Sequence, residues 1–423
     1  MSRRSALSAF CASNGALECA ARRIAGSSQR TFSSSSRRDA GMSHFTQTSS
    51  PELDELLSTI RHKIILPSYL PTEQRKKIFS SKYEKTLQSD PIIIEIDGEV
   101  FKFRHLNPSK DMPQTRRSVV TAISQFSTPA DFANLRPLLE GIAYANRKFK
   151  SSFYCKVLRV VGEKGHIYDI IECARGVART GFKLDSSEKA NEILHFVQMK
   201  AVESGWDEAV TVKALRWAEM VLELMQQEEH QPKRRKDEHM LEGELPLYRD
   251  PMVLLAPLHL VAALVAKRGP EADPELVEKL NKYARDIVRL WPEGKKLTEV
   301  QPSALYEEYD KMGYLLPPSK FVALTTPLLY GLETAIQVVS PELASQLQSR
   351  RDILDKEVGG ARAAAAQKAA ARMAAAQMDG AQMTETRAET VLRKVYHNEA
   401  WREDQRRLEE EQRQLEEQEA GPA

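Results

Sequence analysis

The chain has few of the residues that usually mark a metal site or a disulfide framework. It has four cysteines in 423 residues, and two of them, Cys11 and Cys19, lie in an N-terminal segment that we expect to be removed. Cys155 and Cys173 are 18 residues apart, with no Cys-x-x-Cys pair and no histidine at metal-ligand spacing. This pattern argues against a zinc site and favours buried free thiols in a reducing compartment.

Long apolar runs and catalytic motifs are also missing from the sequence. No run reaches the roughly 18 to 20 apolar residues of a membrane-spanning helix, and the best one, 252–266, contains Pro257 and His259. There is no phosphate-binding glycine loop, nucleophile elbow or zinc-protease motif, and His166 and His195 fit capping or core positions. We therefore predict no enzyme, no cofactor or metal, no small-molecule substrate and no integral membrane segment.

Acidic residues are nearly absent from residues 1–40. This segment is rich in serine and alanine and holds seven arginines against Glu18 and Asp39. Such a composition is typical of a mitochondrial transit peptide. Residues 30–33 resemble the matrix processing motif, in which an arginine lies three residues before the cut, so Arg30 predicts a cut after Phe32. The alternative is a disordered basic tail that binds nucleic acid.

The leader also accounts for the positive charge of the whole chain. Residues 1–40 contribute +7 and −2, or +5, so the net charge of +2 leaves −3 for residues 41–423. A nearly neutral chain is not a purely electrostatic nucleic-acid binder, so any RNA contact would come from local basic patches.

One clear β signal stands out in a chain of mostly helical pattern. Residues 92–96 and 99–104 alternate or are β-branched, and they flank Asp97-Gly98, a strong two-residue hairpin signal. A lone hairpin is marginal in water, so it must pack on helices or on a partner. We interpret residues 50–128 as an N-terminal attachment region with a β-hairpin near residues 92–104.

The rest of the chain predicts two helical regions and an extended tail. Apolar residues recur at helical spacing over 129–228 and again over 251–358. The polar segment 229–250 between them is predicted to be a linker. Residues 359–423 are rich in alanine, glutamate, glutamine and arginine, which predicts a long helix with a thin apolar stripe. The predicted fold is all-α: stacked helical hairpins, one short β-hairpin and a long C-terminal helix.

The first helical region contains an internal echo. Residues 145–150 align with residues 178–183 at an offset of 33, and each precedes a helix. Residues 181–185 resemble the turn between pentatricopeptide repeats, with Leu184 where proline is usual, and the offset resembles that of tetratricopeptide and pentatricopeptide arrays. The resemblance implies degenerate helix–turn–helix units, and the arginine-rich leader is similar to those of fungal matrix proteins.

Basic clusters with aromatic neighbours are the candidate functional sites, since cations bind phosphates and aromatic rings can stack on unpaired bases. One cluster is Arg75 to Lys77 beside Phe79 and Tyr83, and another is the run Lys233 to Lys236. For each cluster, an ordinary solvated helix face is the competing interpretation. The predicted RNA-binding residues are Arg147, Lys148, Phe149, Lys150, Arg175, Arg179, Phe182 and Lys183.

These features together predict a structural or accessory component of the mitochondrial ribosome, located in the matrix or peripheral to the inner membrane. Its partners would be mitochondrial ribosomal proteins and rRNA. Two alternatives remain open: a pentatricopeptide-like factor for the stability, processing or translational activation of a mitochondrial mRNA, and an assembly factor for a respiratory complex.

Overall fold

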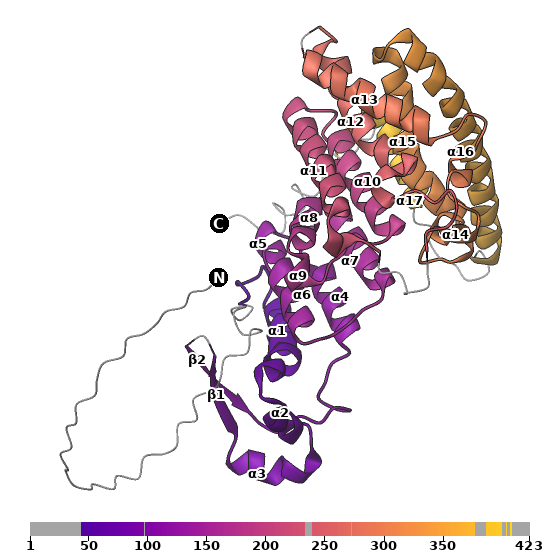
Figure 1. The fold of residues 1–423 in the computed structure, drawn as a ribbon. Helices are drawn as coiled ribbons and strands as arrows, with labels where there is room; N and C mark the ends of the chain where they lie inside the picture. Colours follow the sequence, from indigo (N-terminus) through magenta and orange to yellow (C-terminus); the bar gives the residue numbers. More distant parts are fainter. Residues whose placement is uncertain are drawn as a thin grey trace, which may run out of the picture. The chain divides into compact units, whose positions relative to one another are not determined.

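The computed structural model describes residues 44–96, 98–232, 239–271, 273–376 and 386–399, together with residues 403 and 407 (Figure 1). The predicted transit peptide, Asp97, the basic run 233–236 and most of the chain after residue 399 lie outside the described residues. The described residues belong to one compact unit, 42–423.

The N-terminal part combines short helices with the predicted β-hairpin. It consists of α1 (Pro51–Ile60), α2 (Thr72–Ile78), α3 (Glu84–Ser89), β1 (Ile92–Ile96) and β2 (Glu99–Phe103). The strands pair antiparallel from Ile92 opposite Phe103 to Ile96 opposite Glu99, and Gly98 has the positive φ of 84° that a tight turn requires. The predicted hairpin is therefore confirmed.

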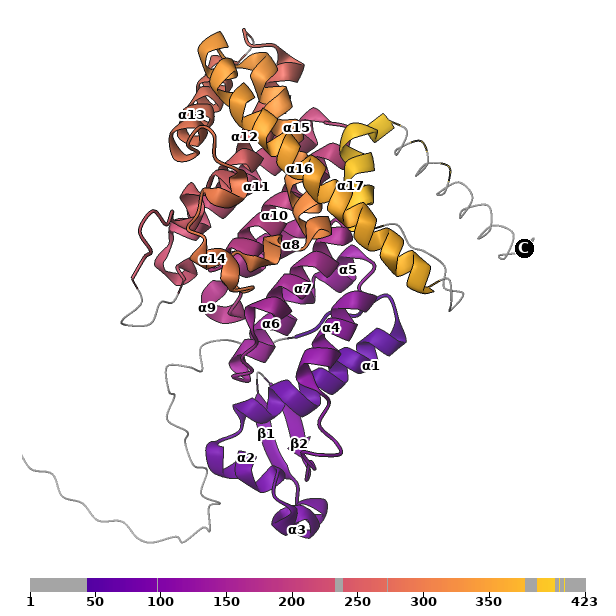
Figure 2. The same ribbon diagram turned by 90° about the vertical axis from the view of Figure 1, so that its right-hand side faces the viewer.

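One face of the hairpin packs on a small apolar core of its own. Leu66, Ile78, Leu87 and Phe103 are buried there, and alternate residues of β1 lie against them. The opposite face of the hairpin is exposed. We call residues 66–106, which share this core, the hairpin module; Figure 2 shows α2 and α3 beside the two strands.

The helices that follow form, together with α1, what we call the helical body. They are α4 (Thr115–Gln125), α5 (Pro129–Phe132), α6 (Leu135–Tyr144), α7 (Ser151–Glu163), α8 (Ile167–Arg175), α9 (Val177–Thr180), α10 (Ser187–Glu203), α11 (Glu208–Gln226), α12 (Pro251–Arg268), α13 (Pro274–Leu290), α14 (Ala304–Glu307), α15 (Pro318–Val338), α16 (Pro341–Ala376) and α17 (Arg387–Tyr396). The predicted all-α fold is thus confirmed. One hydrophobic core contains side chains from both predicted helical regions, on either side of 229–250.

Helix α10 lies at the centre of the body and is buried on nearly every side, because it packs on α7, α11, α12 and α15. Its buried carboxylates take part in an ion cluster. Arg159 Nη1 lies 3.1 Å from Glu188 Oε1 and 3.2 Å from Glu192 Oε1, and Lys320 also pairs with Glu188. Burial alone would raise the pKa of Glu188, but the hydrogen bond and charge of Lys320 lower it below the ordinary value.

Two helices, α12 and α15, are long and apolar enough to cross a membrane by length and composition alone. In the structure 78% of the α12 window and 67% of the α15 window are buried, and the two helices pack closely on each other. A Cβ on Gly331 would come within 2.5 Å of His259 Cβ, so glycine allows this close approach. Pro257, in the longest apolar run of the sequence, lies inside α12 without ending it.

The C-terminal helices differ in detail from the predicted tail. Helix α16 begins at Pro341 and continues through Gly359 and Gly360, so the predicted boundary at residue 359 lies inside one helix. Helix α17 packs against α10 and α15 through the buried residues Ala388, Val391 and Val395. The sequence predicts a C-terminal helix with a thin apolar stripe, and this part of the tail covers the chain's own core.

Polar contacts reinforce the docking of α17. Arg387 Nη2 lies 2.7 Å from Glu192 Oε2, and Lys394 Nζ lies 2.6 Å from Glu203 Oε1. Glu192 is fully buried, so Arg387 completes the ion cluster from the end of the described chain. Removing one partner from such a buried cluster leaves charge uncompensated, which makes α17 part of the body's architecture.

Candidate nucleic-acid interface

Two helix–turn–helix connections carry the basic residues that the sequence singled out. The first joins α6 to α7 and the second joins α9 to α10. Each has a residue in the left-handed region just after the helix ends, Asn146 with φ 55° and Gly181 with φ 68°. Glycine and asparagine adopt this conformation at low cost, so the echo in the sequence corresponds to a repeated local structure.

The structure brings these two turns together at one end of their helices. Ser151 Oγ and Ser186 Oγ, at the starts of α7 and α10, are 3.3 Å apart. Arg179 on α9 reaches back to α6, where its Nη2 lies 2.8 Å from Glu140 Oε2. We call the six predicted basic residues the turn surface: Arg147, Lys148 and Lys150 in the first turn, Arg179 and Lys183 at the second, and Arg175 at the end of α8.

The six cations of the turn surface differ in how they are paired. Arg147, Lys148 and Lys150 are exposed and have no carboxylate partner among the described residues, and the half-buried Lys183 also has none. Arg175 Nη1 lies 2.6 Å from Glu172 Oε1, and Arg179 is paired with Glu140. Exposed pairs of this kind contribute little free energy, so they can exchange their carboxylate for a phosphate.

Glu140 was not found from the sequence. Its i,i+4 spacing from Arg136 is a recognisable helical pair, and the two side chains are 2.9 Å apart. Its second contact, with Arg179, joins residues on different helices that no local pattern relates.

The aromatic residues of the site serve packing more than base recognition. Phe182 is fully buried, with its ring 5.5 Å from that of Tyr154, so it belongs to the core, contrary to the prediction that its ring stacks on a base. Phe149 is half-buried and stacks on Phe153 with ring centroids 4.0 Å apart. Burial also raises the pKa of Tyr154, and the charge of Asp185 adds to this. The turn surface thus presents positive charge and at most one aromatic ring.

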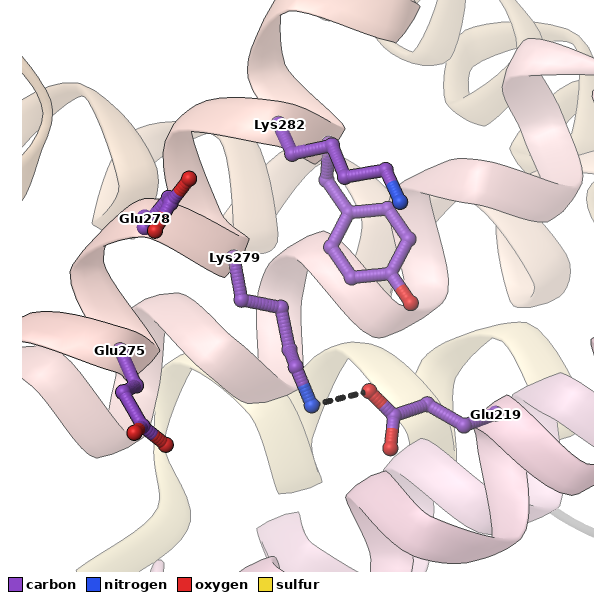
Figure 3. Close-up of a pocket in the computed structure, with 6 residues that line it drawn as sticks. Glu219, Glu275, Glu278, Lys279 and Lys282 are labelled. Carbon is purple, nitrogen blue, oxygen red and sulfur yellow. Dashed lines mark ion pairs between the residues drawn. The ribbon is translucent and has the colours of Figure 1, made fainter.

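A separate pocket lies between α11 and α13, where Lys279 Nζ is 2.7 Å from Glu219 Oε1 (Figure 3). Carboxylates, ammonium groups and one phenol line it: Glu219, Glu275, Glu278, Lys279, Lys282 and Tyr283. This lining contains no histidine or cysteine that could act as a nucleophile or as a base near neutral pH. Across the described residues, no group of histidine, cysteine, aspartate or glutamate side chains is arranged to hold a metal ion.

The fold and the site together define a class: a helical scaffold protein with a basic surface at the ends of paired helices. Comparison with known proteins gives the particular family. The family model of mitochondrial ribosomal protein mS27 matches residues 30–389. The small ribosomal subunit protein mS27 of Neurospora crassa is 38% identical over 326 residues, which cover 74% of this chain and 82% of the relative.

The chain therefore belongs to the mS27 family of mitochondrial ribosomal proteins. This membership confirms the prediction of a mitochondrial ribosomal protein and favours it over a transcript-specific factor or an assembly factor for a respiratory complex. The resemblance to pentatricopeptide turns describes how two of its helical hairpins are connected.

Proposed function

We propose that this protein is a structural constituent of the small subunit of the mitochondrial ribosome, in the matrix, with rRNA and neighbouring ribosomal proteins as its partners. Family membership over most of the chain carries the proposal, because the relative from Neurospora crassa is a small-subunit protein. The role is one of scaffolding rather than catalysis: the protein supports translation by holding RNA and protein in place.

Within this role, the turn surface is the proposed rRNA contact. Arg147, Lys148 and Lys150 lie on one short connection, point three positive charges to solvent and lack a carboxylate partner among the described residues. Such side chains bind the phosphate backbone without reading bases, which suits a constituent held at one place by its assembly. Helices α6 and α7 pack in the core and hold the connection in place.

Sedimentation tests the main proposal. A tagged copy is followed through a sucrose gradient from gently lysed mitochondria, with and without magnesium depletion and ribonuclease. Stoichiometric migration with the small subunit that survives a moderate salt wash is the expected result. Migration in light fractions with a few transcripts would instead identify an mRNA factor, and light fractions without RNA would identify an assembly factor.

A finer proposal is that the protein, with the small subunit, takes a peripheral position at the inner membrane. The same lysate tests this. Recovery of the small subunit with salt-washed inner membranes, together with the tagged protein, would support it. Recovery only in the clarified matrix fraction would contradict it.

Charge reversal tests the turn surface. The variant Arg147→Glu/Lys148→Glu/Lys150→Glu should be released from the small subunit at a lower salt concentration than the wild type. The matched control is Lys213→Glu/Arg216→Glu/Lys356→Glu, which reverses three exposed body cations that have no carboxylate partner among the described residues. Equal salt resistance of the two variants would remove the turn surface from the proposal.

A further inference from the structure

The hairpin module carries a concentration of positive charge that its own fold does not use. Residues 75–85 contain five basic residues and one acid, Glu84. We define the module surface by six residues: Arg75, Lys76, Lys77, Lys82, Lys85 and Arg104. Arg75 is half-buried, the other five are exposed, and none has a carboxylate partner among the described residues.

The backbone brings Arg104 to the end of α2, where the basic segment 75–85 continues. The carbonyl of Ile78, at the end of α2, accepts hydrogen bonds from Leu106 N at 2.8 Å and from His105 Nδ1 at 2.9 Å. This ties the segment that leaves β2 to the last turn of α2, so Arg104 emerges beside Lys77 and its neighbours. The Nζ atoms of Lys77 and Lys82 each lie 5.9 Å from the ring centroid of Tyr83.

Stability does not explain the arrangement. The module is held by the apolar core around Ile78 and Phe103, both buried, while its cations lie outside that core. Like charges packed along eleven residues repel one another, and no carboxylate of the described chain pairs with them to offset this. A polyanion that binds from outside would offset this repulsion.

The hairpin module meets the helical body close to the start of the turn that carries three cations of the turn surface. Tyr69, which packs against the module core, stacks on Tyr144, the last residue of α6, with ring centroids 4.3 Å apart. The turn that carries Arg147, Lys148 and Lys150 begins immediately after Tyr144. Gly141 strengthens the contact, because a Cβ there would come within 2.5 Å of Ile65 Cδ1.

We propose that the module surface and the turn surface both bind rRNA, with the module as a second contact to the phosphate backbone. This inference rests on the proposed function, since it needs the protein to be seated on ribosomal RNA. Two contacts on one folded unit bind more tightly than either alone, because the second forms within an already associated complex. RNA is the occupant that this charge fits, because an unpaired basic cluster complements a phosphate backbone.

The test uses three variants of the full-length protein in purified small subunits. The first is Lys76→Glu/Lys77→Glu/Lys82→Glu, the second is the turn-surface reversal described above, and the third combines them. Retention is measured over a series of salt washes, and ultraviolet crosslinking to RNA is mapped to peptides of residues 66–106. The body reversal at Lys213, Arg216 and Lys356 is the control.

Each reversal alone should lower the salt concentration at which the protein is released, and the combined variant should be released lowest. Each lost phosphate contact reduces the magnitude of the negative slope of log affinity against log salt by about 0.7 to 0.9. Crosslinks within residues 66–106 should fall severalfold in the first variant and persist in Lys76→Arg/Lys77→Arg/Lys82→Arg, which keeps the charge.

Two results would overturn the inference. If the module variant keeps wild-type retention and crosslinks while the turn variant loses them, the module does not bind rRNA. If residues 66–106 crosslink to protein and not to RNA, the module is a protein contact. Both outcomes leave the proposed function intact, whereas a wild-type protein that never migrates with the small subunit would remove the proposed function itself.

Discussion

The helical body and the hairpin module differ in where their charged side chains lie and in what they pair with. In the body, Glu188 and Glu192 are buried and Arg159, Lys320 and Arg387 pair with them, so charge is part of the architecture. In the module, Glu99 is the only described residue that takes part in an ion pair. Its lysines and arginines surround a purely apolar core. The difference teaches that the module's cations are available to another molecule, whereas the body cations that pair with Glu188 and Glu192 are not.

Removing the buried charge of the body should have the largest effect on stability. Glu192→Gln deprives Arg159 and Arg387 of a carboxylate that is fully buried. Breaking a buried ion cluster on one side costs about 3 to 5 kcal/mol. Urea unfolding measures this loss, and Glu163→Gln on the exposed surface should change the free energy of unfolding by less than about 0.5 kcal/mol. Equal effects of the two substitutions would mean that the cluster does not hold the body together.

An apolar truncation should affect the module and leave the body folded. Ile78→Ala removes a fully buried side chain from the module core, at a cost of about 2 to 4 kcal/mol. Hydrogen exchange should show faster exchange over residues 66–106 and unchanged protection in α10. A uniform loss of protection would contradict the view that the two regions have separate cores.

The carboxylate of Asp131 anchors the segment just before α1. Asp131 accepts hydrogen bonds from Ser49 N at 2.8 Å and from Ser127 N and Thr128 N at 2.9 Å each. Asp131→Ala should cost about 2 kcal/mol at neutral pH, because it leaves these donors unpaired. Guanidinium unfolding of both proteins measures the difference.

The cost of Asp131→Ala should also depend on pH. Burial by itself raises the pKa of Asp131, but its hydrogen bonds from Ser127, Thr128 and Ser49 hold the pKa well below the ordinary 3.8. A lowered folded pKa stabilises the protein above the unfolded pKa, and this contribution is lost as the pH falls. The difference in the free energy of unfolding between the wild type and Asp131→Ala should shrink by about 1 kcal/mol from pH 6 to pH 3. A constant difference would show that the carboxylate is not responsible.

Neutralising the module surface should have the smallest effect on stability. Lys76→Ser/Lys77→Ser/Lys82→Ser removes exposed charges that have no carboxylate partner, so the free energy of unfolding should change by less than about 0.5 kcal/mol. Thermal unfolding of the free protein checks this. A large loss would place these lysines in the fold and weaken the contrast between the two regions.

Local patterns predicted much of the fold. Asp97-Gly98 between β-branched runs indicated the hairpin, helical periodicity indicated the body, and the echo of residues 145–150 in residues 178–183 corresponds to two equivalent turns. These signals are local because turn geometry and helix faces depend on residues a few positions apart. The two turns that carry most of the predicted cations lie close together, although the sequence could not show that Glu140 pairs with Arg179.

Other features depend on contacts between distant segments. The burial of α10 on nearly every side cannot be read from its own residues, since Glu188 and Glu192 look like surface positions until Lys320 and Arg387 are placed against them. For the same reason Phe182 looked like an exposed ring beside two basic residues. The change to an alanine-rich composition after Gly359-Gly360 suggested a boundary there. In the structure α16 continues through both glycines, because no cap or proline ends the helix at that point.

The docking of α17 also makes the fold sensitive to the completeness of the chain. Glu192 and Arg387 are separated by 195 residues, so a polypeptide that emerges amino end first exposes α10 long before its last cation is available. A chain that stops short of α17 keeps a carboxylate in its interior without its full complement of positive charge, and it leaves the apolar surface around Val322 and Met199 uncovered. A truncated copy therefore lacks both the last cation of the ion cluster and the cover over this apolar surface.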